Sequence, residues 1–121
     1  MDNEQKPQRQ NLQERMTVFA LDVQRLVKQL PHSIANTEYS RQLIRSSSSI
    51  GANYIEADEA LGKGDFMMKM RTSRREAKES RYWLRLLDVD AHEDLENRRR
   101  KLAQEAYEFL LILSAIIKKC S

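Results

Sequence analysis

Apolar residues recur at steps of three and four along most of this chain, and this spacing constrains the fold more than any other feature of the sequence. Residues so spaced lie on one face of an α-helix, which turns once every 3.6 residues, whereas a half-buried strand requires strict alternation. Only three glycines and two prolines interrupt the 121 residues. The sequence therefore predicts long helices joined by short links.

Two helices are expected in the first half of the chain. The first ends at Pro31, because the proline ring clashes with the preceding helical turn. Its apolar stripe consists of Met16, Phe19, Val23, Leu26 and Leu30. The second starts near Asn36 or Thr37, either of which can cap the first free N–H groups. Its stripe is small and polar for a buried face, and consists of Leu43, Ser46, Ile50, Asn53, Ala57 and Ala60.

The four consecutive serines from Ser46 to Ser49 have the composition of a linker. The apolar spacing nevertheless continues through them without a slip, and no proline interrupts it. We therefore interpret this run as helix, in which small side chains let a neighbouring helix approach closely.

Two more helices are expected in the second half. The run Gly62–Gly64 should form the turn, since glycine readily adopts the positive φ that ends a helix, and Asp65 should cap the helix that follows. That helix carries Phe66, Met70, Ser73, Ala77, Ser80, Leu84 and Leu87. After an acidic link over residues 88–93, Asp94 should cap the last helix. The final stripe is Leu95, Leu102, Ala106, Phe109, Leu113 and Ile116.

Short links force consecutive helices to run in opposite directions, so we predict an all-α, up-down-up-down antiparallel four-helix bundle. Residues 1–11 are polar and are expected to form a disordered tail, and residues 12–121 a single domain. Cys120, the only cysteine, cannot form an intrachain disulfide. No signal peptide is recognisable, and the apolar run from Phe109 to Ile117 is too short to span a bilayer, so we expect a cytoplasmic protein without membrane contact.

Three blocks of sequence occur in a characteristic order. The first two are Gln42–Arg45 and Ser49–Ala57, and the third extends from the pair Asp65-Phe66 through Glu76–Ser80 to Leu84 and Leu87. Over about Val18 to Ile117 they resemble the bacterial four-helix-bundle family of 23S rRNA intervening-sequence proteins, whose pattern reads Gln-Leu-x-Arg and then Ser-Ile-x-x-Asn-Ile-Ala-Glu-Gly. That family includes the accessory variability determinant (Avd) proteins of diversity-generating retroelements.

Two positions depart from the family pattern. Gly51 stands where proline is common, and Ala57 where glycine is common, which suggests a sub-branch. The resemblance implies a four-helix bundle without known catalytic activity that assembles as a cyclic homopentamer. For the retroelement branch it also implies binding to nucleic acid or to a reverse transcriptase.

The basic residues of the third helix fall at steps of three and four, most of them one position after a residue of the apolar stripe. They therefore form a row that flanks the core by about 100°. This basic ridge consists of Arg71, Arg74, Lys78, Arg81 and Arg85, together with Arg75 beside them. Such a row of cations can bind successive phosphates. The alternative is a solvated face on which Glu76 and Glu79 pair with these bases.

A second basic cluster, from Arg98 to Lys101, lies at the start of the fourth helix, where the helix dipole disfavours cations. Arg99 and Arg100 are therefore candidate contacts for an anionic partner. The alternative is local neutralisation by Glu93, Asp94 and Glu96.

Asn53 and Glu56 lie one turn apart on the inner side of the second helix, where polar groups need partners. They form either a polar binding cluster or a buried network that fixes the register of the helices. The candidate partners of Glu56 are Arg45, Arg74 and Lys78.

Tyr54, Tyr82 and Trp83 are candidates for stacking on bases, with packing between helices or subunits as the alternative. Some apolar residues of the third and fourth helices lie outside the main stripes. These are Trp83, Leu86, Leu110, Ile112 and Ile117. A second stripe is best buried against another copy of the chain, so we expect a homo-oligomer; the number five comes from the resemblance.

Catalysis has little support in the sequence. His32 and His92 fall in expected links without an acid or cysteine at ligand spacing, and the Glu-x-x-His pairs of di-iron bundles are absent. We therefore expect no metal, no cofactor and no enzymatic activity. The predicted function is an oligomeric scaffold that binds the backbone of RNA or DNA through the basic ridge, with a reverse transcriptase or ribonucleoprotein as a further partner. The alternative is a protein–protein adaptor that does not bind nucleic acid, which the modest net charge of +3 also allows.

Overall fold

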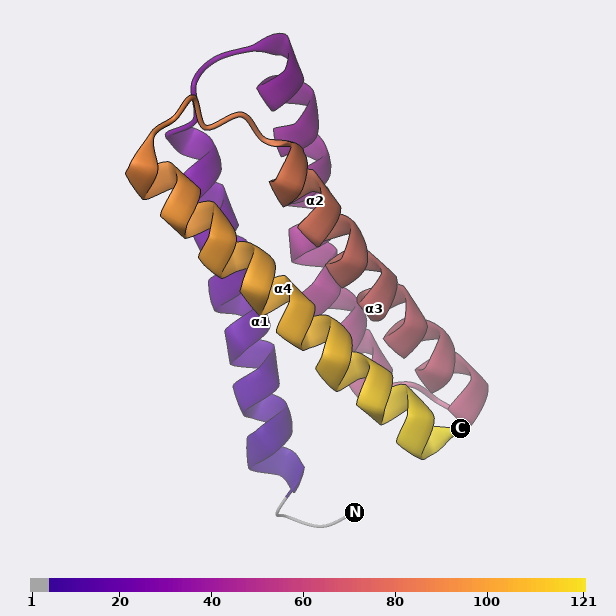
Figure 1. Ribbon diagram of the computed structural model, residues 1–121. Helices are drawn as coiled ribbons and strands as arrows, with labels where there is room; N and C mark the ends of the chain where they lie inside the picture. The colour runs from indigo at the N-terminus through magenta and orange to yellow at the C-terminus, as the bar shows by residue number, and fades with distance from the viewer. Residues whose placement is uncertain (1–4) are drawn as a thin grey trace.

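The computed structural model describes the backbone of residues 5–121 and the side chains from residue 11 onward. Four helices and no strand are found in this part of the chain. They are α1 (Gln5–Lys28), α2 (Ile34–Asp58), α3 (Lys63–Leu86) and α4 (Glu93–Cys120), shown in Figure 1. The prediction of an all-α bundle of four helices is confirmed.

The first helix begins at Gln5, so it includes residues 5–11 of the segment that we expected to form a tail. Pro7 lies in its first turn, where a proline is tolerated because the N–H group that it lacks has no partner within the helix. Residues 1–4 lie outside the described residues. The helix ends at Lys28, three residues before Pro31.

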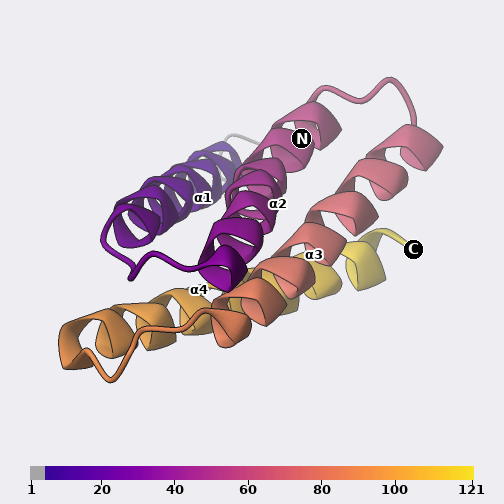
Figure 2. The ribbon, with the colours of Figure 1, turned by 90° about the horizontal axis from the view of Figure 1, so that it is seen from above.

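Each helix packs against two others, in the cyclic order α1, α2, α3, α4. Figure 2 shows α2 between α1 and α3, with α4 on the opposite side of the bundle. Contacts between α2 and α3 run in opposite sequence order, since Ser46 meets Ser80 while Ile50 meets Ser73. The two helices are therefore antiparallel, and they make the most extensive pairing in the bundle.

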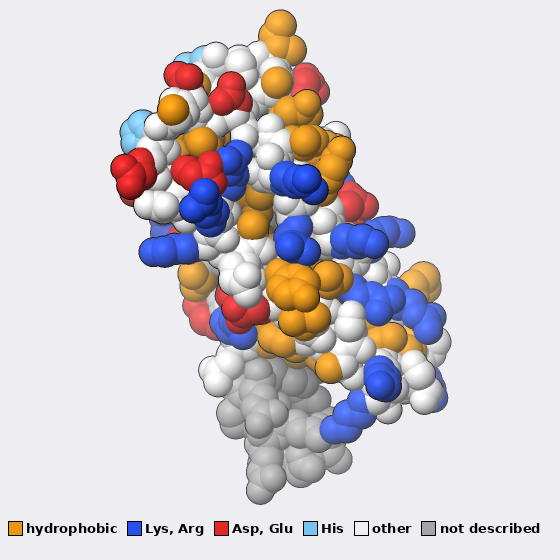
Figure 3. All heavy atoms as spheres, viewed as in Figure 1, with side chains coloured by type: hydrophobic (Ala, Val, Ile, Leu, Met, Phe, Trp, Pro, Cys, Tyr) orange, Lys and Arg blue, Asp and Glu red, His pale blue; other side chains and the backbone are white. Residues whose placement is uncertain are grey.

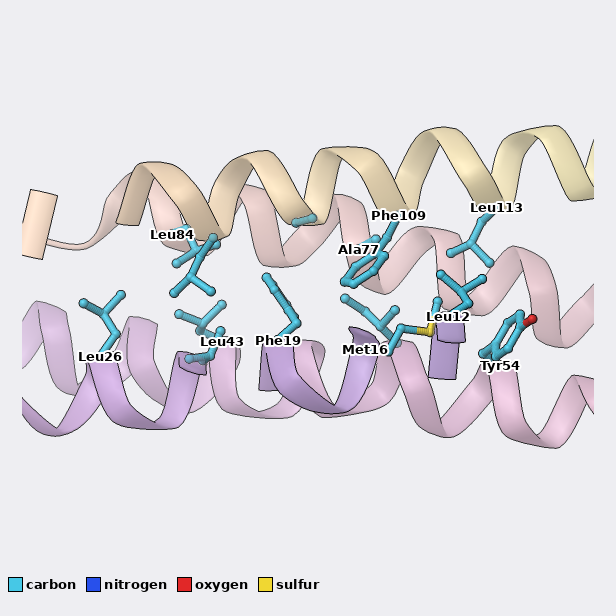
Figure 4. Packing of buried hydrophobic residues seen from close by; sticks show 14 of the residues in the cluster. Leu12, Met16, Phe19, Leu26, Leu43, Tyr54, Ala77, Leu84, Phe109 and Leu113 are labelled. Carbon is cyan, nitrogen blue, oxygen red and sulfur yellow. The ribbon is translucent and has the colours of Figure 1, made fainter. Parts of the chain in front are cut away.

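The core is formed by one stripe from each helix, and the side chains converge between the ribbons in Figure 4. At its centre the rings of Phe19 and Phe109 meet edge to face, with centroids 5.5 Å apart. All predicted stripe residues of α1 are buried, and in α3 only Phe66 is half-buried. In α4 the last buried position is Ile117, whereas the predicted Ile116 is half-buried.

Four of the six predicted stripe residues of α2 are buried, namely Leu43, Ser46, Ile50 and Ala57. Ser47 and Tyr54 are also buried, whereas Asn53 and Ala60 are half-buried. The stripe therefore keeps its direction and continues from Ile50 through Tyr54 to Ala57, at steps of four and three, rather than through Asn53. The large Tyr54 ring fills the core space that the sequence pattern assigned to Asn53.

Buried serine hydroxyls satisfy one another where α2 and α3 touch. The Oγ atoms of Ser46 and Ser80 are 2.9 Å apart, and the Ser73 hydroxyl donates to the carbonyl oxygen of Ile50 at 2.7 Å. All three serines are fully buried. The serine run is helix, as predicted, and its small side chains permit this close contact.

The helix caps differ from the predicted ones. Ser33, rather than Asn36 or Thr37, caps α2 by accepting from the backbone N–H of Asn36 at 3.0 Å. Gly62 caps α3 in an extended conformation, and His92 caps α4, so neither Asp65 nor Asp94 is a cap.

No described glycine has a positive φ, which corrects the prediction for the turn between α2 and α3. The left-handed residues are Asp90 and Ala91, in the link between α3 and α4, with φ of 54° and 58°. For alanine this conformation is strained. The reversal from α3 to α4 therefore uses the backbone geometry that the sequence pattern assigned to the glycines.

Asn36 joins the two links at one end of the bundle. Its amide nitrogen donates to the carbonyl oxygens of Pro31 and Asp88, at 2.9 and 2.8 Å. Its amide oxygen accepts from the backbone N–H of Asp88 at 2.9 Å. Asn36 is 3% exposed and these bonds are partly buried, and they tie the α1–α2 link to the α3–α4 link.

The second apolar stripe is largely used inside the single chain. Ile117 belongs to the core, and Ile112 and Trp83 pack against it. Leu86 and Leu110 are half-buried. The exposed large apolar residues lie elsewhere, at Val18, Leu21, Ile34, Ile44, Ile55, Leu61, Met68, Tyr82 and Leu111.

Replacing Ser46 by leucine should destabilise the protein by about 1–3 kcal/mol, because the larger side chain must displace α3 from a fully packed contact. The matched control is Ser48→Leu, since Ser48 is exposed and bonds only to its own helix. A thermal melt followed by circular dichroism compares the two. Equal melting temperatures for both variants and the parent would show that α2 and α3 do not pack closely at Ser46.

Replacing Asn36 by alanine should cost about 2–4 kcal/mol, because three partly buried hydrogen bonds are lost and the Asp88 backbone groups lose their partner. Asn53→Ala is the control, because the Asn53 side chain donates only to the Ser49 carbonyl oxygen of its own helix. Urea unfolding curves give both free energies. A loss for Asn36→Ala no larger than that for Asn53→Ala would contradict the role of Asn36 as the tie between the links.

Candidate nucleic-acid interface

The basic ridge lies along the outer side of α3, next to α4. Five of its members are exposed, and Arg74 is half-buried. Figure 3 shows Lys and Arg side chains gathered over α3 and α4 on this face, with apolar atoms between them. The structure therefore brings the predicted ridge residues onto one continuous surface.

The acidic residues of α3 do not neutralise this ridge. Glu76 and Glu79 both bind Arg45 of α2, with nitrogen–oxygen distances of 3.3 and 3.1 Å. Glu76 is buried, with its side chain 8% exposed, so this pair lies at the α2–α3 contact on the side away from α4. The expected alternative, in which these two acids pair with the ridge, is thus wrong.

Four ridge cations have no ion pair, side-chain hydrogen bond or ring contact among the described residues. They are Arg71, Arg75, Lys78 and Arg85. Because each is exposed and each lies within one or two helical turns of the next, their charges add along the helix. The result is a surface of uncompensated positive charge on a protein whose net charge is only +3.

The other two ridge residues contact α4. A guanidinium nitrogen of Arg74 donates to the Ser114 hydroxyl at 3.4 Å. The guanidinium carbon of Arg81 lies 4.5 Å from the ring centroid of Tyr107, in a cation–π contact. Arg74 and Arg81 therefore contribute to helix packing as well as to the charge of the face.

Sequence reasoning missed Tyr107 as part of this surface. It follows the core residue Ala106 directly, and the same offset of one position relates most ridge residues to the core of α3. A residue one position after the core stripe of α4 could therefore have been predicted to lie on this surface.

The second basic cluster is neutralised locally. Arg99 donates to the carboxylate of Glu96 and to the carbonyl oxygen of Leu87, and Arg100 lies 3.0 Å from Glu96. Arg98 lies 3.7 Å from Asp94. Arg99 uses two of its donors on Leu87 and Glu96 and its side chain is 20% exposed, whereas the Arg100 side chain is 75% exposed. These contacts favour the local pairing that we considered as the alternative.

Asn53 and Glu56 do not form a buried network. The Glu56 carboxylate is 57% exposed and binds Lys69 at 2.7 Å, rather than Arg45, Arg74 or Lys78. This hydrogen bond, followed by the charge of Glu56, raises the pKa of Lys69. The prediction failed because the buried stripe of α2 passes through Tyr54 rather than Asn53, which leaves Glu56 on the outer side of the helix. The buried acid at this contact is Glu76.

Charged groups also join α1 to α4. Arg15 lies 2.7 Å from Glu105 and 3.1 Å from Glu108. The hydrogen bonds that Arg15 donates to Glu105, together with the nearby negative charges, raise the pKa of Arg15. Glu105 and Glu108 thus face α1, whereas Tyr107 and Ser114 lie on the side of α4 that contacts α3.

The three candidate aromatic residues occupy different environments. Tyr54 is buried in the core and Trp83 is half-buried, so packing accounts for both. Tyr82 is 54% exposed. Of the three, only Tyr82 has a ring surface open to a ligand.

Features of a catalytic or membrane protein are not evident in the described residues. No group of three His, Cys, Asp or Glu side chains there can hold a metal ion. A hollow of about 580 Å³ lies at the α3–α4 link, but its walls are the paired groups around Glu96 and the link itself. No helix in the described part of the chain is long and apolar enough to cross a membrane.

Comparison with known proteins agrees with this architecture. The structure is similar to the crystal structure of a protein of unknown function from the S23 ribosomal protein family of Bacteroides thetaiotaomicron. The two sequences are 29% identical, the TM-score is 0.74, and the match covers 88% of this chain and 97% of the other. No curated protein matches the sequence.

The family comparison accounts for most of the chain. The model of the 23S rRNA-intervening sequence protein family matches residues 8–115, a range that includes the paired acids of α3, the basic ridge and the serine contact between α2 and α3. The chain therefore belongs to the 23S rRNA-intervening sequence protein family.

Proposed function

We propose that this protein is a non-enzymatic, oligomeric scaffold of the bacterial cytoplasm that binds the phosphate backbone of RNA or DNA through α3. The observation that carries the proposal is the pairing of Glu76 and Glu79 with Arg45 of α2. This pairing directs the acids of α3 away from its basic ridge. The remaining cations are available to an anionic partner.

The geometry of the ridge suits a polyanion. From Arg71 to Arg85 the helix axis advances by about 21 Å, at about 1.5 Å per residue. Guanidinium groups bind phosphates both through their charge and through hydrogen bonds from their several N–H donors. Backbone contacts carry no base information, so binding by this surface is weakly selective for sequence. Of the two secondary contacts expected on α4, Arg100 remains accessible, while Arg99 is mostly buried and two of its donors are engaged by Leu87 and Glu96.

Self-association multiplies such a surface by symmetry and strengthens its field. The proposed oligomer is a homopentamer, a number that comes from the resemblance to the family. Exposed apolar residues on α1 and α2, among them Val18, Leu21, Ile44 and Ile55, support an interface between copies. A reverse transcriptase or a ribonucleoprotein is the proposed further partner, by resemblance to the retroelement branch.

Charge reversal on the ridge tests the binding proposal. Arg71→Glu with Lys78→Glu should weaken binding to a mixed-sequence RNA or DNA more than about tenfold at 0.1 M salt, and should make the salt slope shallower by about 1.4–1.8. Both side chains are exposed and unpaired in the described chain, so folding should be unaffected. Fluorescence anisotropy over a salt series measures affinity and slope together. Arg74 and Arg81 are less suitable, because both contact α4.

The matched control reverses two charges on another face, with Lys28→Glu on α1 and Arg41→Glu on α2. Its net charge equals that of the ridge variant, so equal losses in both would indicate only a general charge effect. Parental affinity in the ridge variant would overturn the proposal. The protein–protein adaptor would then be the better account of this surface.

Assembly is tested on the unmodified protein by light scattering behind a sizing column. A homopentamer of 14.2 kDa chains should give a mass of about 71 kDa. A single peak at the mass of one chain at micromolar concentration would contradict the oligomeric scaffold, without bearing on whether the single chain binds nucleic acid.

A further inference from the structure

An exposed aromatic ring stands within the basic ridge. Tyr82 is 54% exposed, lies four residues after Lys78 and three before Arg85, and therefore shares a face of α3 with both. Large aromatic side chains gain most from burial, and Tyr82 leaves part of its ring surface open among unpaired cations. Purely electrostatic binding to phosphates does not use this ring.

The ring of Tyr82 is held in place by its neighbours. It packs edge to face on Trp83, with centroids 5.4 Å apart and an angle of 62° between the rings. Trp83 in turn stacks on Tyr39 of α2, with centroids 6.1 Å apart and an angle of 26°. This row of rings fixes one edge of Tyr82 against the bundle. A ring restrained in this way loses little further freedom when a ligand stacks on it.

A second flat group lies beside Tyr82 on the α4 side. The guanidinium group of Arg81 rests over the Tyr107 ring at 4.5 Å. Guanidinium planes, like aromatic rings, stack on unpaired bases. The ridge thus combines free cations at helical spacing with flat groups held by ring contacts.

We infer that the ridge binds single-stranded nucleic acid, with a base stacked on Tyr82 and the adjoining phosphates on Lys78 and Arg85. The inference rests on the proposed function and specifies its ligand. In a duplex the faces of the bases are covered by their neighbours, so the duplex offers Tyr82 only sugar and phosphate. A single strand offers both a backbone for the cations and a free base face for the ring.

Two substitutions at the same exposed position separate stacking from hydrophobic contact. Tyr82→Leu removes the ring but keeps an apolar side chain, whereas Tyr82→Phe keeps the ring and removes only the hydroxyl. The full-length protein is titrated with three probes of equal length: an oligothymidine strand, an abasic strand with the same number of phosphates, and a DNA duplex. Melting curves for both variants check that the fold is unchanged.

Tyr82→Leu should weaken binding to the oligothymidine roughly five- to hundredfold, the loss expected for one stacked base. It should leave binding to the abasic strand and to the duplex unchanged, and Tyr82→Phe should bind all three probes as the parent does. A strand with 2-aminopurine at each position in turn adds a direct readout. Its fluorescence should be quenched by the parent and by Tyr82→Phe, but not by Tyr82→Leu.

The outcomes also separate this inference from the proposed function. If the parent binds the abasic strand as tightly as the oligothymidine, the ridge binds phosphates and the stacking inference is wrong. If the parent binds none of the three probes, the proposed function fails and the inference fails with it. If Tyr82→Leu instead changes the oligomer mass and leaves affinity for all probes intact, the ring belongs to an interface between copies.

Discussion

The close contact between α2 and α3 is the constraint on which the rest of the structure depends. It is possible because Ser46, Ser73 and Ser80 are small and satisfy their buried hydroxyls within the contact. A larger apolar side chain there would separate the helices, and an unpaired polar one would carry a desolvation penalty. Because the helices lie so close, Arg45 reaches across to both Glu76 and Glu79.

That reach determines how charge is distributed over the surface. Glu76 and Glu79 pair with Arg45 and therefore do not neutralise the ridge. Packing on the α2 side of α3 thus leaves positive charge on the opposite side, where the ridge lies. On α4, Glu105 and Glu108 are similarly turned toward Arg15 of α1. The near balance of 21 basic and 18 acidic residues therefore conceals an uneven surface, which explains why net charge alone was a poor guide to a binding face.

The sequence predicted the features that depend on local periodicity, namely the four helices, their core stripes and the common face of the ridge. It did not predict features that depend on contacts between distant segments. Asn36 has the side chain of a helix cap, but it forms hydrogen bonds with the backbone of Asp88, 52 residues away. Glu56 was expected to face inward because spacing alone did not distinguish Asn53 from Tyr54 as the core position, and Tyr54 occupies it. The partner of Glu76 lies on another helix, which no pattern within α3 reveals.

The central claim is that four ridge cations are free to bind phosphates. It is tested most directly by the salt dependence of binding between the unmodified protein and a single-stranded oligonucleotide. If the four cations each contact one phosphate of the single strand, the logarithm of the binding constant should fall against the logarithm of salt concentration with a slope of about −2.8 per protomer. A slope near zero, or no binding at low salt, would contradict the account and leave the ridge as a solvated face.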